Sequence, residues 1–183
     1  SAGSVIAAQR CDAFGAPIDV QPIVVGASTS TSRPAVAFDG TRWLICWNQG
    51  TTIVGRRMGT DGTFADAAPF VVLSGVSTVF GGPDVAANNG VFLVVAVRPS
   101  TYPQYQDPWG RRVRGSDGLL LDAGPLLLGS SFAVRPRVAA VGRRGWWTAA
   151  PSGFAAVRRA DLYNVEIRYV SRGCAVSRCV VDW

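Results

Sequence analysis

The sequence predicts an all-β fold built from a repeated unit. Short apolar stretches alternate with Asp-Gly and other turn signals roughly every eight to twelve residues, a spacing typical of β-proteins. No stretch combines a helical period with caps at both ends, and the nearest candidate is a short helical turn over 155–162. The same landmarks return in the same order about every fifty residues, which predicts internal repeats.

The clearest unit begins at Pro34 and runs to Gly82. Asp39-Gly40 supplies a tight turn that needs a positive backbone φ. The stretch that follows this turn is nearly all apolar, as expected for a strand covered on both faces. The four strands expected in this unit span 35–38, 42–47, 52–58 and 70–73.

Further copies flank this unit. The second begins at Pro83 and closes from Pro125, and a degenerate third begins at Pro136. The N-terminal segment, with expected strands over 5–10 and 22–26, matches only the back half of the unit. The matching positions there are Arg10, Gly15, Asp19 and Pro22, in line with Arg57, Gly62, Asp66 and Pro69. The predicted organisation is a half unit (1–32), two full units (33–82 and 83–134) and a degenerate unit (135–183).

A four-stranded unit with this period is the signature of a β-propeller blade. The repeated landmarks resemble the blade repeats of secreted bacterial β-propeller proteins, myxobacterial ones especially. The resemblance covers most of the chain and implies a β-propeller-like array of about three and a half four-stranded antiparallel blades, secreted or at the cell surface. The alternative is a β-sandwich with coincidental spacing. The residues that carry the resemblance are Pro34, Val36, Ala37, Trp43, Leu44, Trp47, Arg57, Asp61-Gly62 and Pro69, and again Pro83, Val85, Ala86, Phe92, Leu93, Val94, Asp117-Gly118 and Pro125.

An array of this size predicts a partner. Closed propellers usually have about four to eight blades, and an open arc would expose a flat apolar sheet face at each end. We therefore expect either another polypeptide that supplies the missing propeller half or self-association. The missing front half is expected upstream, on a segment removed by proteolysis or on a separate chain.

The charged residues are unusual. All eighteen basic residues are Arg, only Glu166 among the twelve acids is Glu, and the net charge is +6. The exclusive use of Arg as the basic residue is most simply interpreted as the codon bias of a GC-rich bacterial genome. The charge favours anionic partners, but the arginines are spread along the predicted strands, so a nucleic-acid partner is not expected. No apolar run is long enough to cross a bilayer.

The four cysteines form no CxxC pair and the chain has no His, so we expect neither a zinc site nor another cofactor. Cys174 and Cys179 are candidates for a disulfide across a predicted turn. A bridge between Cys11 and Cys46 is less favoured, because Cys46 lies in a buried-looking strand, where a free thiol behaves as a small apolar group.

Two long loops are the candidate binding sites, because function concentrates in such loops. They connect second to third strands over 98–109 and 151–163. Their aromatic side chains could stack on sugars or on a partner's apolar groups, and their arginines could bind carboxylate or sulfate. The structural alternative is that these side chains pack the loops onto the blades. The candidate ligand-binding residues are Arg98, Tyr102, Tyr105, Trp109, Arg158, Arg159 and Tyr163.

The sequence lacks several side chains that enzymes commonly use in catalysis. His and Lys are absent, and a pair of Glu residues is impossible because the chain has only one Glu. Tyr163, Glu166, Asp161 and Arg168 could be cast as a sialidase-like site. Pairing of Glu166 with a neighbouring Arg is the preferred interpretation.

Repeated charged residues are assigned structural roles. Asp61 and Asp117 are expected to form turns rather than to bind calcium. In each of the pairs Arg56-Arg57 and Arg111-Arg112, one member is expected to point outward and bridge to the Asp of a neighbouring turn, for example Asp66 or Asp122.

The predicted function is a non-catalytic recognition or scaffolding module of a secreted or surface propeller. Its expected ligand is a carbohydrate or a protein, bound by the long loops. One alternative is part of a glycosidase-like or sialidase-like propeller that contributes Arg and Tyr to a shared active site. The other is a structural subunit of a surface assembly.

Overall fold

The computed structural model describes residues 4–29, 33–77, 81–99, 106–129, 136–141, 145–149, 155–160 and 165–170. Every helix or strand among these residues is a β-strand, which confirms the predicted all-β class.

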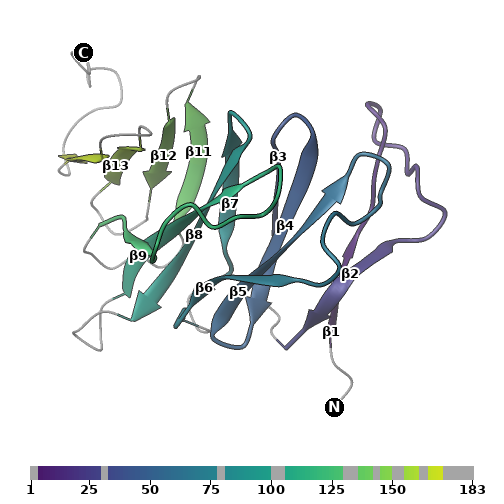
Figure 1. The fold of residues 1–183 in the computed structure, drawn as a ribbon, viewed down its shortest axis with the longest axis horizontal. Coiled ribbons are helices and arrows are strands. Elements are labelled where there is room, and N and C mark those ends of the chain that lie inside the picture. The colour runs from purple at the N-terminus through teal and green to yellow at the C-terminus, as the bar shows by residue number, and fades with distance from the viewer. Residues whose placement is uncertain are drawn as a thin grey trace.

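Two complete four-stranded antiparallel sheets form the centre of the molecule (Figure 1). Each is a simple meander in which neighbours in sequence are neighbours in the sheet. The strands predicted in the first unit are confirmed. The first sheet contains β3 (Ala35–Phe38), β4 (Arg42–Gln49), β5 (Thr52–Gly59) and β6 (Phe70–Ser74). The second contains β7 (Asp84–Asn88), β8 (Val91–Pro99), β9 (Gln106–Arg114) and β10 (Leu126–Leu127).

Strand pairs flank the two central sheets. At the N-terminal end β1 (Ser4–Ala8) pairs with β2 (Ile23–Ser28). On the other side β11 (Arg137–Val141) pairs with β12 (Gly145–Ala149), and β13 (Ala155–Ala160) pairs with β14 (Val165–Val170). The described part of the segment 155–162, the nearest candidate for a helical turn, is thus a strand. Pairing along the whole of β13 with β14 overrides a weak local preference.

The sheets follow one another in chain order across the molecule (Figure 1). Their first strands lie side by side, with β3 next to β7 and β7 next to β11, while β2 contacts β4 and β6 contacts β9. Apolar clusters fill the spaces between successive sheets, which explains why β4 and β8 are almost continuously apolar. The structure is thus a series of layers, each packed against the next.

The joint between the β1–β2 sheet and the first complete sheet depends on Trp47. The Trp47 side chain is fully buried, and its indole N–H donates a hydrogen bond of 3.0 Å to the carbonyl of Ala27. The ring lies against Gly26, where a Cβ would come within 2.7 Å of the ring atom Cζ2. Glycine at this position in β2 is therefore required by the close approach of the indole.

Candidate functional site

An Arg–Asp ion pair recurs in three successive sheets. In each case the Asp accepts hydrogen bonds from both the backbone N–H and the guanidinium of its Arg. The backbone hydrogen bonds measure 2.8, 2.7 and 2.8 Å in the pairs Arg10–Asp19, Arg57–Asp66 and Arg112–Asp122. The predicted pairing of the arginines with turn aspartates is confirmed. The predicted outward orientation is wrong for Arg57, whose side chain is 5% exposed, because it is covered by the next sheet.

Two of these arginines, Arg10 and Arg57, also reach forward to the following sheet. Nη1 of Arg10 donates to the carbonyl of Thr60 at 2.9 Å, and Nη1 of Arg57 donates to the carbonyl of Gly115 at 2.8 Å. Thr60 and Gly115 are equivalent, since each lies three residues after the Arg of its own Arg–Asp pair. A hydrogen bond at the same repeat position thus joins two successive pairs of sheets.

The glycine of the Asp-Gly turn lies directly against the arginine of the preceding sheet. Gly118 has a φ of +79°, and a Cβ there would come within 3.1 Å of Nε of Arg57. Gly62 has a φ of +88° and lies in the same way against Arg10. Glycine is therefore needed at these turns for two reasons, the left-handed backbone and the close approach of a guanidinium.

The first arginine of each Arg-Arg pair reaches back to the preceding sheet. Nη1 of Arg56 donates to the carbonyl of Val25 in β2 at 2.9 Å, and Nη1 of Arg111 donates to the carbonyl of Val72 in β6 at 3.3 Å. Val25 and Val72 are equivalent positions of the repeat. We call the backward and forward hydrogen bonds together the arginine clip. The sequence displayed the Arg-Arg and Asp-Gly repeats that signal it, but the contacts between sheets were missed.

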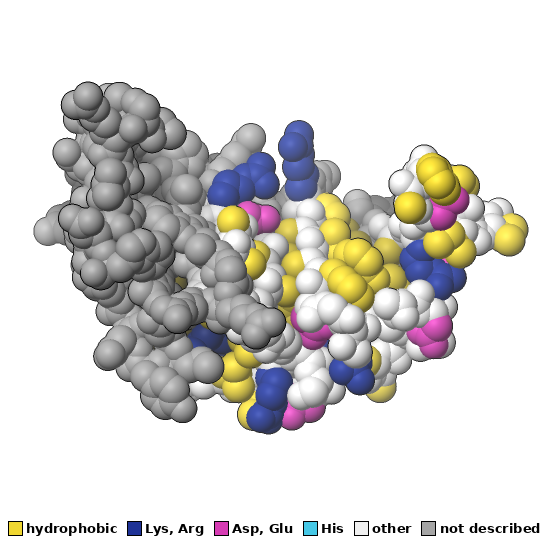
Figure 2. Space-filling view, turned by 90° about the horizontal axis from the view of Figure 1, so that it is seen from above, with side chains coloured by type: hydrophobic (Ala, Val, Ile, Leu, Met, Phe, Trp, Pro, Cys, Tyr) yellow, Lys and Arg dark blue, Asp and Glu magenta, His cyan; other side chains and the backbone are white. Residues whose placement is uncertain are grey.

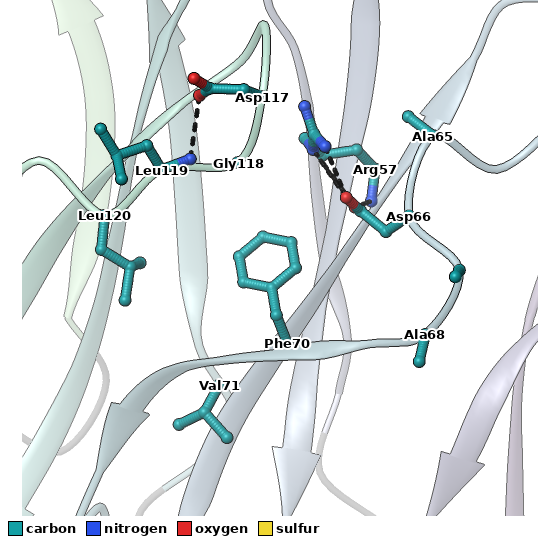
Figure 3. A pocket seen from close by; sticks show the side chains of 11 residues that line it. Arg57, Ala65, Asp66, Ala68, Phe70, Val71, Asp117, Gly118, Leu119 and Leu120 are labelled. Carbon is teal, nitrogen blue, oxygen red and sulfur yellow. Dashed lines mark hydrogen bonds and ion pairs between the residues drawn. The ribbon is translucent and has the colours of Figure 1, made fainter.

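A groove opens beside the hydrogen bond from Arg57 to Gly115, between the first and second complete sheets (Figure 3). Its volume is about 640 Å³. One wall is the connection into β6 and the start of that strand, and the other is the Asp-Gly turn that follows β9. The ring of Phe70 lies between the two walls (Figure 3). The lining residues are Arg57, Ala65, Asp66, Ala67, Ala68, Phe70, Val71, Asp117, Gly118, Leu119 and Leu120.

The groove offers apolar surface rather than free charge. Val71 and Leu119 are 47% and 52% exposed on opposite walls. The Arg57 guanidinium is already engaged with Asp66 and with the carbonyl of Gly115. This arrangement suits the apolar side chains of a ligand better than an anion.

Asp117 is held in its turn by hydrogen bonds. The Arg114 guanidinium is the main cause that lowers the pKa of Asp117, and the backbone N–H of Leu119 adds to it. Hydrogen bonds from the backbone N–H and hydroxyl of Thr63 likewise lower the pKa of Asp61. Both residues therefore form turns, as predicted.

Two of the predicted ligand-binding residues contact each other. Trp109 belongs to β9 and not to a loop, because β8 and β9 pair from Val91↔Arg114 to Pro99↔Gln106. The guanidinium carbon of Arg98 lies 4.7 Å from the centre of the Trp109 ring, a cation–π contact. The predicted loop over 98–109 was thus too long, and one face of Trp109 is already covered.

The remaining candidates are placed only in part. Arg158 and Arg159 lie in β13, where the register sets Arg159 opposite Glu166 and Arg158 opposite Ile167. Tyr102, Tyr105, Tyr163, Cys174 and Cys179 lie outside the described residues.

The two described cysteines are both free. Cys11 is exposed, and burial raises the pKa of the Cys46 thiol. Within the described part of the chain, no three His, Cys, Asp or Glu side chains gather where they could hold a metal ion. The same part of the chain contains no helix that is long and apolar enough to cross a membrane. No protein-family model matches the sequence, and no curated protein is significantly similar to it.

Proposed function

We propose that the chain is a non-catalytic recognition or scaffolding module, a segment of a secreted or surface β-propeller, that binds a protein partner. The propeller arrangement is supported by the side-by-side first strands β3, β7 and β11, since the inner strands of blades gather around a common axis. It is further supported by the arginine clip, which recurs at equivalent positions at two successive joints.

The observation that carries the choice of partner is the chemistry of the groove. Eight of its eleven lining residues have no polar side-chain group, and the other three, Arg57, Asp66 and Asp117, are already engaged in ion pairs. A sugar needs several free hydrogen-bonding groups, whereas apolar side chains of a peptide need only the exposed walls. A protein segment therefore fits this groove better than a glycan does.

The alternatives receive less support. A carbohydrate stacked on Trp109 would have to compete with Arg98 for one face of the ring. A sialidase-like site would need Glu166 to serve a Tyr, whereas the register sets Glu166 opposite Arg159.

A selection of random peptides displayed on phage, with the full chain as bait, tests the protein-binding groove. We expect apolar peptides that bind the wild-type chain and lose at least about tenfold in affinity on Val71→Glu or Leu119→Glu. Leu127→Glu is the matched control, because Leu127 is also an exposed apolar residue but does not line the groove. Selected peptides that bind all three variants equally, or retention of the chain on glycans with no groove-dependent peptide, would contradict the proposal.

A further inference from the structure

The apolar wall of the groove has a counterpart at the preceding joint, between the β1–β2 sheet and the first complete sheet. Three apolar positions in β6 and the connection before it recur in β2 and the connection before that strand, at the offset that relates Arg57 to Arg10. The three pairs of positions are Ala65 and Ile18, Ala67 and Val20, and Val71 and Val24. We call Ile18, Val20 and Val24 the first-joint surface.

The contacts across the first joint match those across the groove. Gly62, in the turn after β5, is the equivalent of Gly118. A Cβ at Gly62 would come within 3.0 Å of Cζ of Arg10 and within 3.1 Å of Cδ1 of Ile23. Ile23 occupies the position of Phe70, whose ring lies between the two walls of the groove (Figure 3). The turn after β5 therefore faces β2 as the turn after β9 faces β6.

The exposure of the first-joint surface is a property of the repeated unit. Ile18, Val20 and Val24 are 56%, 95% and 58% exposed. Their three counterparts in the groove are also exposed, although the β1–β2 sheet packs against the sheet that carries them. Positions that a preceding sheet does cover behave differently, since Met58 is buried and its counterpart Cys11 is exposed. The packing of successive sheets therefore leaves the first-joint positions open in both units.

Apolar side chains gather around the first-joint surface. Two of its residues, Ile18 and Val20, are larger than the alanines at the equivalent groove positions. Phe14, in the same connection between β1 and β2, is 97% exposed. Figure 2 shows hydrophobic side chains on the projecting part of the molecule at the right, the side on which Figure 1 places β1 and β2. Exposed apolar residues gathered in one region are typical of interaction sites.

The two joints differ in the charge that borders them. Asp117 beside the groove forms an ion pair with Arg114. Its counterpart Asp61 has no such arginine, because Gly59 takes the position of Arg114, and Asp61 belongs to none of the four ion pairs among the described residues. Hydrogen bonds from Thr63 lower the pKa of Asp61, so its carboxylate is charged at neutral pH. A Lys or Arg of a partner can therefore pair with Asp61.

We propose that one extended segment of a protein partner binds the groove and the first-joint surface together, with apolar side chains at both and a Lys or Arg beside Asp61. This inference rests on the proposed function and names the kind of segment that is bound. Stacked sheets lie about 10 Å apart, and an extended chain advances about 3.3 Å per residue. A short extended segment therefore reaches both sites, and joining two weak contacts in one segment raises its affinity above that of either contact alone.

The test selects linear random peptides of about 20 residues, displayed on phage, with the full chain as bait. We expect the recovered peptides to carry two apolar stretches and a Lys or Arg. Synthetic copies should lose at least about tenfold in affinity on Val20→Glu and, separately, on Val71→Glu. Val5→Glu is the matched control, because Val5 is 62% exposed in the same sheet as Val20 but belongs to neither surface.

A second pair of variants tests the charge. Asp61→Asn should weaken the same peptides about threefold and reduce the salt dependence of their binding. Asp117→Asn is the control, because its carboxylate is already paired with Arg114 and the change should alter affinity less. Equal effects of the two variants would overturn the proposed contact with Asp61.

The pattern of losses separates this inference from the proposed function. Loss of affinity on Val71→Glu alone would overturn the inference and leave the groove as a binding site. Loss on Val20→Glu alone, or equal binding to both variants and the wild type, would overturn both. Concentration-dependent self-association in sedimentation that is lost on Val20→Glu would also overturn the inference, because a second copy of the chain would then occupy the first-joint surface.

Discussion

The two joints that flank the first complete sheet use the same polar contacts and opposite apolar packing. Both have an arginine that reaches back to a carbonyl of the preceding sheet and another that reaches forward to the next turn. At the first joint a large Trp47 lies against Gly26. At the second, Ala96 takes the place of Trp47, and Leu73 takes the place of Gly26.

At the first joint the large side chain comes from the sheet that follows and the small residue from the sheet that precedes. At the second joint this order is reversed. Trp109 adds to the exchange, since it stands opposite Ala96 in the sheet as Val54 stands opposite Trp47. The comparison indicates that the arginine clip is the constant part of the two joints. Apolar side chains of different size fill the rest of each joint, as expected for a close-packed interior.

The largest expected effect comes from breaking the first joint. Trp47→Ala removes a fully buried indole and should lower the free energy of unfolding by about 3–5 kcal/mol. Gly26→Leu should lower it by about 1–3 kcal/mol through overpacking. The double variant reproduces the Ala and Leu of the second joint and should recover at least half of the summed loss. Urea denaturation measures all three, and strictly additive losses would refute the exchange of sizes.

The buried ion pair should matter more than an exposed one. Arg57→Met leaves the carboxylate of Asp66 without its guanidinium in a site that is 13% exposed, so we expect a loss of about 3 kcal/mol. Arg114→Met is the control, because Arg114 and Asp117 are 44% and 51% exposed and their pair should contribute less than about 1 kcal/mol. Equal effects of the two variants in thermal denaturation would contradict a structural role for the clip.

A smaller effect separates the glycine turn from the clip. Gly40 and Gly118 both have positive φ, but a Cβ at Gly40 would meet nothing within 4 Å, whereas one at Gly118 would approach Arg57. Gly40→Ala should therefore lose only the backbone term of about 1–2 kcal/mol. Gly118→Ala should lose more, as measured by the free energy of unfolding in urea. The contact between turn and arginine would be unimportant if the two losses were equal.

Much of the fold could be predicted from the sequence, because strands and turns have local signals. The alternation of apolar stretches with Asp-Gly turns placed β3 to β6 correctly. The repeated Arg-Arg pairs predicted that one arginine of each would bridge to a turn aspartate such as Asp66 or Asp122, and the structure shows which arginine does so, Arg57 and Arg112. The repeat alignment set Arg10 and Asp19 in line with Arg57 and Asp66, and the structure shows that these two residues also form an ion pair.

The contacts between sheets could not be predicted in the same way. They join residues 31 to 58 positions apart, and the acceptors are backbone carbonyls such as those of Thr60 and Val72, which leave no side-chain signal. Trp109 was assigned to the long, proline-containing loop expected over 98–109. The pairing of β9 with β8 nevertheless includes Pro108 and extends to Gln106.

The most direct test of the central claim, that arginine clips hold successive sheets together, is hydrogen exchange in Arg56→Gln. This variant installs the residue found at the equivalent position in the N-terminal sheet, keeps a side-chain amide for the carbonyl of Asp66, and removes the reach to Val25. We predict faster exchange of the amides in β1 and β2, with the amides of β7 to β9 unchanged. Unchanged exchange in β1 and β2, or an equal increase throughout the described sheets, would contradict the account.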